Sequence, residues 1–162
     1  LNEYFQLYLD SSLLEDYAAQ LGSYCPFFIE NKPALATGTG TALTPFELSL
    51  QGYWFVLVNP GIHISTQAAY AGVSPKPAET DLKELLSSMD LERWKSELVN
   101  DFEASIFPQE PKLAALKAQL YDLGANYAAM SGSGSTMFGI FKSEPQLKAD
   151  FFDNFYVKKV SL

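Results

Sequence analysis

A loop of small residues between two short apolar segments constrains this chain more than any other feature. The loop is Ser131-Gly132-Ser133-Gly134-Ser135, and it separates residues 125–130 from residues 136–142, which both have the composition of strands. Glycines let consecutive backbone N–H groups converge on an anion, and serines add hydroxyl donors, although the same residues are typical of a plain turn. Neither Gly-Lys-Ser/Thr nor a long helix follows, so this is neither a Walker nor a Rossmann loop. The sequence predicts a hairpin whose turn is either structural or anion-binding.

A further strand is predicted by the continuous apolar run Tyr53-Trp54-Phe55-Val56-Leu57-Val58. The run consists of β-forming residues, is too short for a helix, and is typical of a strand buried on both faces. It ends at Asn59-Pro60-Gly61, which indicates a turn. Because the character of the chain changes here, we expect a domain boundary near residue 50.

Several helices are predicted between and after these strands. Ser65 can cap a short helix that contains Ala68, Ala69 and Tyr70, and Thr80 and Asp90 are placed to cap two more. Pro111 opens the clearest helix, with leucines at helical spacing up to Gly124. A last helix opens at Ser143-Glu144-Pro145, and Phe155-Tyr156-Val157 forms the final strand. This order of elements predicts an α+β fold, a two-layer sandwich of helices on one face of a mostly antiparallel sheet.

The first 50 residues show a different pattern. Residues 1–9 have apolar residues at helical spacing, and Ser12 starts a capping box for a helix that ends at Gly22. Residues 26–29 and 34–37 are predicted to be the two strands of a hairpin. Because the pattern is already under way at Leu1, we expect the chain to be cut from something longer.

Composition limits the classes of partner. The 162 residues carry 11 Lys and Arg against 19 Asp and Glu, a formal charge of −8, and the basic residues are scattered, which argues against nucleic acid. A single cysteine, Cys25, allows no internal disulfide and no cysteine-based zinc cluster, and we expect no metal site. No apolar run has the length of a membrane span and no signal peptide is visible, so we expect a cytoplasmic protein.

Four segments together resemble a known family. They are Leu21 to Phe28, Ala36 to Gly40, Asn59 to Thr66 and Met130 to Phe141, and their order and spacing resemble the second half of the 4-diphosphocytidyl-2-C-methyl-D-erythritol kinases. These enzymes are members of the superfamily of galactokinase, homoserine kinase, mevalonate kinase and phosphomevalonate kinase. The resemblance implies a fragment of an ATP-dependent transferase of the non-mevalonate route to isoprenoids and terpenoids. It also implies that residues 1–50 are the tail of the N-terminal kinase domain and that residues 51–162 are the C-terminal, substrate-binding α+β domain. The full-length kinase would phosphorylate the 2-hydroxyl of 4-diphosphocytidyl-2-C-methyl-D-erythritol and use ATP and Mg²⁺.

The resemblance also implies roles for individual residues. Tyr70 falls where relatives stack the cytosine of the substrate, and Thr66, one helical turn earlier, shares its face. The loop from Ser131 to Ser135 would support the phosphate-binding region. Tyr24 occupies the position of the catalytic aspartate of the family, and a neutral phenol cannot replace a carboxylate as proton acceptor.

The resemblance therefore implies no catalytic residue in these 162 residues. The main phosphate loop of the superfamily has no counterpart in them either, so we expect the chain alone to be inactive and not to bind ATP tightly.

Two other interpretations stay open. The chain could be a non-enzymatic α+β domain that senses a ligand or binds a partner, or part of a related kinase that acts on another alcohol. Binding of cytidine diphosphate compounds would separate these cases. For a truncated N-terminal domain we also expect self-association through exposed apolar surface.

Overall fold

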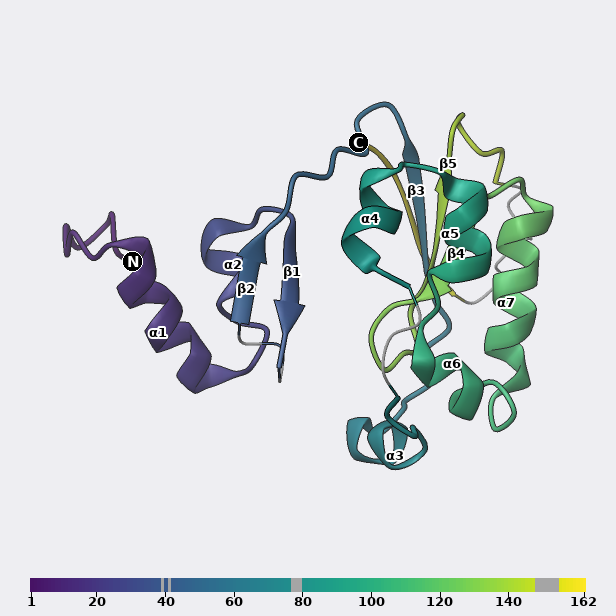
Figure 1. Cartoon of the computed structure of the whole chain (residues 1–162), viewed down its shortest axis with the longest axis horizontal. Coiled ribbons are helices and arrows are strands. Elements are labelled where there is room, and N and C mark those ends of the chain that lie inside the picture. Colours follow the sequence, from purple (N-terminus) through teal and green to yellow (C-terminus); the bar gives the residue numbers. More distant parts are fainter. Residues whose placement is uncertain (39, 41, 77–79, 148–154) are drawn as a thin grey trace. The chain divides into compact units, whose positions relative to one another are not determined.

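The computed structural model describes residues 1–38, 40, 42–76, 80–147 and 155–162. The chain forms two compact units, Leu1–Ser49 and Leu50–Leu162. Each unit has its own helices and strands (Figure 1). No helix in the described part of the chain combines the length and the apolar character that crossing a membrane requires.

In its described part, the unit Leu1–Ser49 contains two helices and a hairpin: α1 Ser11–Leu21, α2 Phe27–Glu30, β1 Ala34–Thr37 and β2 Ala42–Pro45. The two strands are antiparallel, with Ala34 opposite Pro45 and Thr37 opposite Ala42. The prediction that residues 26–29 form a strand is wrong, because they lead into and form α2. Pro26 has helical backbone angles, and Asn31 ends α2 in the left-handed conformation at φ 51°. The true partner of β1 follows it in the sequence.

Two further predictions for this unit need correction. Helix α1 is capped by Asp10, whose carboxylate accepts a hydrogen bond from Leu13 N at 2.8 Å, so Ser12 lies inside the first turn. Residues 1–9 form turns and no helix, because Gln6 and Tyr8 have φ values of 51° and 53°. Those values interrupt a right-handed helix in spite of the apolar spacing.

The residues of the unit Leu50–Leu162 that the structure describes form one antiparallel sheet of four strands, in the order β4-β5-β3-β6. The strands are β3 Trp54–Asn59, β4 Tyr127–Met130, β5 Met137–Phe141 and β6 Tyr156–Ser161. The predicted strands at 53–58, 125–130, 136–142 and 155–157 are confirmed, with the apolar run of β3 in the centre of the sheet. The predicted α+β class is also confirmed.

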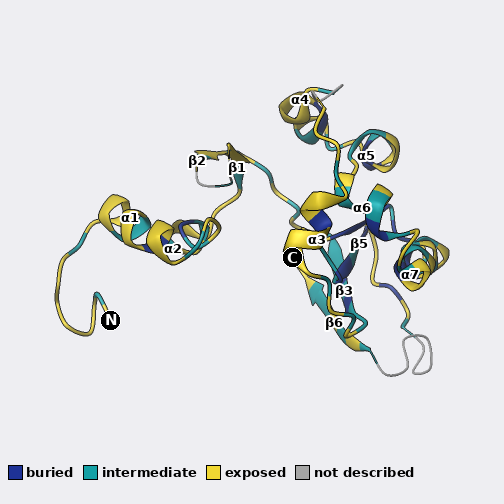
Figure 2. Cartoon of the chain, turned by 90° about the horizontal axis from the view of Figure 1, so that it is seen from below, coloured by how far each residue is buried: buried dark blue, intermediate teal, exposed yellow. Residues whose placement is uncertain are grey.

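The core of this unit lies between the sheet and α7, Pro111–Asp122. Leu113, Leu116 and Leu120 form the buried face of α7 and pack with Val56 and Val58 of β3 and with the inward side chains of β4 and β5. Figure 2 shows this burial as dark blue on the strands and yellow on the outer side of α7. The helix begins with a proline and is followed by a glycine, as the sequence predicts.

Among the described residues between β3 and α7, the chain forms four short helices: α3 Thr66–Ala71, α4 Leu82–Ser87, α5 Leu91–Glu97 and α6 Asp101–Ile106. Ser65 caps α3 and Asp90 caps α5, as predicted. Thr80 is not the cap of α4; Asp81 is, because its carboxylate accepts from Lys83 N at 2.8 Å. The sequence patterns do not predict α6. Residues 143–147 are not helical, and the remainder of the helix predicted after Ser143 falls mostly outside the described residues.

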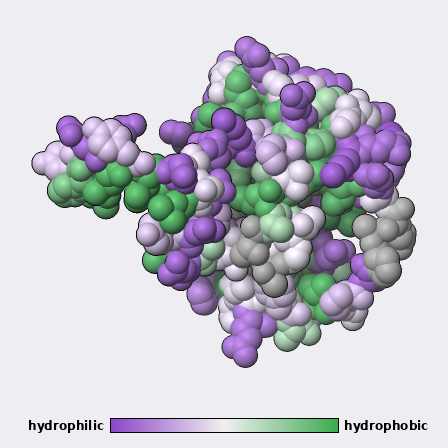
Figure 3. Space-filling view, turned by 60° about the vertical axis from the view of Figure 1, so that its left-hand side comes forward, coloured by the Kyte–Doolittle hydropathy of each residue, from purple (hydrophilic) through white to green (hydrophobic). Residues whose placement is uncertain are grey.

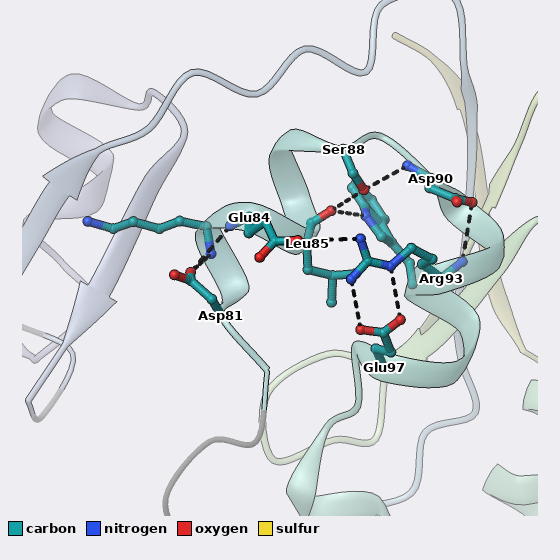
Figure 4. A network of polar contacts seen from close by, with 9 residues as sticks. Asp81, Glu84, Leu85, Ser88, Asp90, Arg93 and Glu97 are labelled. Atoms are coloured by element: carbon teal, nitrogen blue, oxygen red, sulfur yellow. Dashed lines mark hydrogen bonds and ion pairs between the residues drawn. The ribbon is translucent and has the colours of Figure 1, made fainter.

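Helices α4 and α5 are locked together by side chains (Figure 4). Trp94 donates its indole N–H to Leu85 O at 2.9 Å, and its ring packs edge to face on Tyr127 of β4. Arg93 binds Glu97 through two hydrogen bonds of 3.0 and 3.1 Å, and these hold the pKa of the Glu97 carboxyl below its usual range. Trp94 therefore holds α5 against Tyr127 of β4, whereas α7 covers the sheet face that carries Val56 and Val58.

Candidate functional site

The loop Ser131–Ser135 forms the tight connection between β4 and β5. Ser131 N donates to Thr136 O at 2.8 Å, and the Ser135 hydroxyl donates to Ile62 O at 2.5 Å. At Gly134, φ is +91°, and an added Cβ would lie 2.8 Å from both Ile64 Cδ1 and Met130 Sδ. The loop therefore needs glycine here for close backbone approach, while its first two residues stay exposed.

The Asn59-Pro60-Gly61 turn is held against the end of this loop. Asn59 donates its amide N–H to Thr136 Oγ1 at 3.0 Å and accepts from Gly61 N at 2.8 Å. Two segments that the sequence singled out, separated by more than 70 positions, therefore contact each other. The segment after the turn, Ile62 to Ser65, leads directly into α3.

Asn100 is one residue of this region that sequence reasoning missed. Its amide nitrogen donates to Met130 O and to Gly132 O, each at 2.8 Å, and its amide oxygen caps α6 by accepting from Phe102 N at 2.9 Å. One signal could have revealed the helix, because an Asn followed three residues later by Glu103 is typical of a helix N-terminus. The contacts to the loop had no local signal.

Glu103 fixes the same end of β4 from inside the protein. One carboxylate oxygen accepts from Met130 N at 2.8 Å and the other binds Lys117 Nζ of α7 at 2.5 Å. The Tyr121 hydroxyl likewise donates to Ala128 O and accepts from Ala128 N, and burial raises the pKa of this phenol. Side chains of α6 and α7 therefore satisfy the outer edge of β4 where another strand would otherwise pair.

Thr66 and Tyr70 lie on α3, and both residues are exposed. Tyr70 is 58% exposed, and its ring meets the edge of Phe102 in α6, with ring centroids 5.0 Å apart and an angle of 76° between the planes. Gly72, directly after α3, lies so close to α6 that an added Cβ would be 2.8 Å from Ser105 Cβ. Helix α6 thus contacts the tyrosine at its first turn and binds the loop through its cap.

A groove of about 820 Å³ opens between the end of α3 and α6. Asn100, Glu103 and Ser105 are among its lining residues from the α6 segment, and Gly72 and Lys76 line it from the segment after α3. Asn100, which binds the loop, therefore lies at a concave surface. Among the described residues, no three His, Cys, Asp or Glu side chains are close enough to form a metal site.

Tyr24 lies in the other unit, between α1 and α2, and is 62% exposed. Its ring is adjacent to Gly40, where an added Cβ would be 3.0 Å from Tyr24 Cε1. Thr66, Tyr70 and the Ser131–Ser135 loop all belong to the unit Leu50–Leu162. These three features therefore share one unit, and Tyr24 lies in the unit Leu1–Ser49.

Comparison with known proteins gives this architecture a family. The family profile described as "GHMP kinases C terminal" matches residues 78–158, from the segment before α4 to the middle of β6. The chain belongs to the GHMP kinase family. The profile covers the Gly/Ser loop, α6 and α7, which together make up most of the site described above.

Named relatives match over nearly the whole chain. A protein of Bacteroides fragilis named 4-diphosphocytidyl-2-C-methyl-D-erythritol kinase is 47% identical over 152 residues, which are 93% of this chain and 55% of that protein. A protein of the same name from Porphyromonas gingivalis is 45% identical over 157 residues, 96% of this chain and 57% of the relative. This member of the GHMP kinase family therefore spans about half the length of the curated relatives it matches.

Solved structures agree with this result. A crystal structure of 4-(cytidine 5'-diphospho)-2C-methyl-D-erythritol kinase superposes with a TM-score of 0.68 at 28% identity and covers 86% of this chain and 50% of that one. A homoserine kinase from Cytophaga hutchinsonii superposes with a TM-score of 0.63 at 12% identity, covering 98% of this chain and 59% of the homoserine kinase. The second match concerns the fold alone.

Proposed function

We propose that this chain is part of an ATP-dependent kinase that phosphorylates the 2-hydroxyl of 4-diphosphocytidyl-2-C-methyl-D-erythritol. The observation that carries the proposal is the identity of 45% and 47% to proteins of that name over more than nine tenths of the chain. Both units of the chain are included in these matches. The activity belongs to the complete kinase, which would bind ATP together with Mg²⁺.

In this proposal Tyr70 and Thr66 bind the cytidine end of the substrate. Tyr70 is more than half exposed, and Phe102 supports its ring at 5.0 Å, so one face of the phenol is presented with restricted freedom to rotate away. Stacking of a base on such a ring contributes about 1–3 kcal/mol. Thr66 lies one turn earlier on the same face of α3 and offers a hydroxyl for hydrogen bonding.

The loop Ser131–Ser135 would support the phosphate groups. Its ends are fixed by Ile62, Thr136 and Asn100, so its backbone amides are already oriented before a ligand binds. Phosphoryl transfer depends mainly on positioning and on stabilisation of charge, and fixed backbone N–H groups supply both. The Leu1–Ser49 unit would belong to the N-terminal kinase domain.

The test is a kinase assay on the protein expressed from the complete reading frame that contains these residues. We expect ADP release with Mg·ATP and 4-diphosphocytidyl-2-C-methyl-D-erythritol, and none with homoserine or mevalonate. The 162 residues alone should show no turnover, because the main phosphate loop of the superfamily does not occur in them. Phosphorylation of another alcohol, or of no acceptor at all, would reject the proposed substrate.

Tyr70→Ala gives this test a residue-level control. Loss of stacking should raise KM for the cytidine diphosphate substrate by roughly tenfold or more, with KM for ATP unchanged. Tyr156→Ala is the matched variant, since Tyr156 is 67% exposed and lies at the start of β6, opposite Asn59 of β3. Equal KM values of the two variants for the cytidine diphosphate substrate would show that Tyr70 does not bind it.

A further inference from the structure

The Asn100 carboxamide contacts two parts of the site with its two ends. The nitrogen donates to the carbonyls on either side of Ser131, those of Met130 and Gly132, at 2.8 Å each. The oxygen accepts from the backbone N–H of Phe102 at 2.9 Å, and the Phe102 ring meets Tyr70 edge to face. One planar group is thus bonded to the loop on one side and to the support of Tyr70 on the other.

These bonds determine where the loop amides point. In a trans peptide the carbonyl and the following N–H point in opposite directions. Because Gly132 O faces Asn100, the Ser133 N–H is directed away from that side chain. Because Met130 O faces Asn100, the Ser131 N–H is directed to Thr136 O and closes the hairpin.

The neighbouring contacts restrict Asn100 itself. Glu103, one turn into α6, accepts from Met130 N, so the N–H and C=O of Met130 are both held by the same short segment. A flip of the Asn100 amide would place its oxygen against the two carbonyl oxygens and its NH₂ group against the Phe102 N–H, so all three hydrogen bonds would be lost. The three partners of Asn100 therefore establish which end of its amide is the nitrogen and which is the oxygen.

We infer that Asn100 is a positioning residue that sets the orientation of the Ser131–Ser135 loop through its nitrogen and, independently, the Tyr70–Phe102 pair through its oxygen. The inference rests on the proposed function for its catalytic consequence only. Substitutions that alter one end of the carboxamide at a time should separate the two effects.

Three variants of the 162-residue chain make that separation. Asn100→Asp keeps the capping oxygen and removes the donor, so only the loop should change. Asn100→Ala removes both ends, so the loop and Tyr70 should both change. Asn126→Asp is the matched control, because Asn126 lies at the start of the same hairpin and its side-chain oxygen accepts from Lys142 N at 2.9 Å.

The measurement is nuclear magnetic resonance of the folded chain at pH 7. In Asn100→Asp we expect hydrogen exchange of the Ser131 amide to become about tenfold faster or more, and the Ser133 amide signal to move, while the ring signals of Tyr70 stay as in the wild type. In Asn100→Ala the ring signals of Tyr70 should move as well. In Asn126→Asp neither set should change. If the new carboxylate at position 100 prevents folding, the neutral cap in Asn100→Ser gives the same comparison.

Two results would overturn the inference. Unchanged loop amides in Asn100→Asp or Asn100→Ser would mean that the other anchors suffice, and Tyr70 signals that move as much in Asn100→Asp as in Asn100→Ala would refute the division between the two ends. In the complete kinase, Asn100→Asp should lower kcat/KM for ATP by roughly 10- to 100-fold and leave KM for the cytidine substrate unchanged. A wild-type protein without kinase activity rejects the proposed function alone, because the spectra do not depend on turnover.

Discussion

The ion pair between Glu103 and Lys117 allows a quantitative test of how the site is anchored. Their side chains are 11% and 24% exposed, and the carboxylate also accepts from Met130 N at 2.8 Å. Lys117→Met leaves a mostly buried carboxylate without its cation, which costs about 3 kcal/mol, the lower end of the range for broken buried pairs because some water contact remains. Glu103→Gln keeps an acceptor for Met130 N but loses a charged hydrogen bond, at a cost of about 2 kcal/mol.

The double variant, Glu103→Gln with Lys117→Met, should be less destabilised than the sum of the two single variants. Neither charge of the pair remains in it, and the remaining cost is about 2 kcal/mol for lost hydrogen bonding and altered packing. The two single costs add to about 5 kcal/mol, so the coupling free energy is about 3 kcal/mol. For a domain of this size 1 kcal/mol corresponds to roughly 4 °C in Tm.

Urea unfolding at pH 7, followed by tryptophan fluorescence, measures these differences. Both tryptophans, Trp54 and Trp94, belong to the Leu50–Leu162 unit, so the signal reports on the correct part of the chain. Glu144→Gln is the control, since Glu144 and its partner Lys159 are 48% and 31% exposed and the loss of this pair should cost about 0.5 kcal/mol or less. Single costs that add up to the double cost within about 0.5 kcal/mol would refute the reasoning.

Three further predictions concern other parts of the chain. In the proposed complete kinase, Tyr24→Asp should raise turnover by a factor on the order of 10², which is the contribution of a positioned proton acceptor. Equal turnover of the two proteins would show that another group orients the substrate hydroxyl. The lowered pKa of Glu97 means that its ionised carboxylate stabilises the fold above the usual pKa of 4.5, and that this stability is lost as the pH falls through the lowered pKa. A titration of the Glu97 carboxyl carbon by nuclear magnetic resonance should therefore give a midpoint below 4.5, and this midpoint should rise in Arg93→Gln. The 162-residue chain should self-associate in light scattering, because the unit Leu1–Ser49 exposes many large apolar side chains, and a strict monomer at high concentration would contradict this.

The surface supports the last of these predictions. Figure 3 shows hydrophobic residues reaching the surface among hydrophilic ones on the face that it presents. In the unit Leu1–Ser49 the apolar side chains that are more than half exposed include Leu1, Tyr4, Phe5, Tyr8 and Phe28. A unit with so much exposed apolar surface gains free energy by covering it.

Local signals are sufficient for the elements that depend on neighbouring residues. Pro111 and Gly124 delimit α7, and the β-forming run from Tyr53 predicts the central strand, because the cause of each element lies within a few positions. The prediction of a strand at residues 26–29 was wrong because it relied on two adjacent phenylalanines, which favour strands. The backbone instead forms a short helix that begins after Pro26, which has helical angles, and ends at Asn31.

The sequence indicates only part of the proposed site. The Gly/Ser loop and the pair of Thr66 and Tyr70 have local patterns that the resemblance picks out, and their roles stay predictions. Asn100 does not, because its bonds to Met130 and Gly132 span 30 and 32 positions and a polar residue before a short helix predicts only a cap. Such a contact is visible only in the folded structure, where β4 lies next to the start of α6.

Helix α6 has only six residues, yet it determines the spacing between the two ends of the proposed site. Its cap holds the loop, its second residue supports Tyr70, and its third binds the end of β4. Gly72 leaves no room for a side chain against Ser105, so the end of α3 is held close to α6. A displacement of α6 would therefore move the tyrosine and strain the loop together. The sequence of α6 has little helical pattern of its own, so this short helix is held in place by its contacts with β4 and α7.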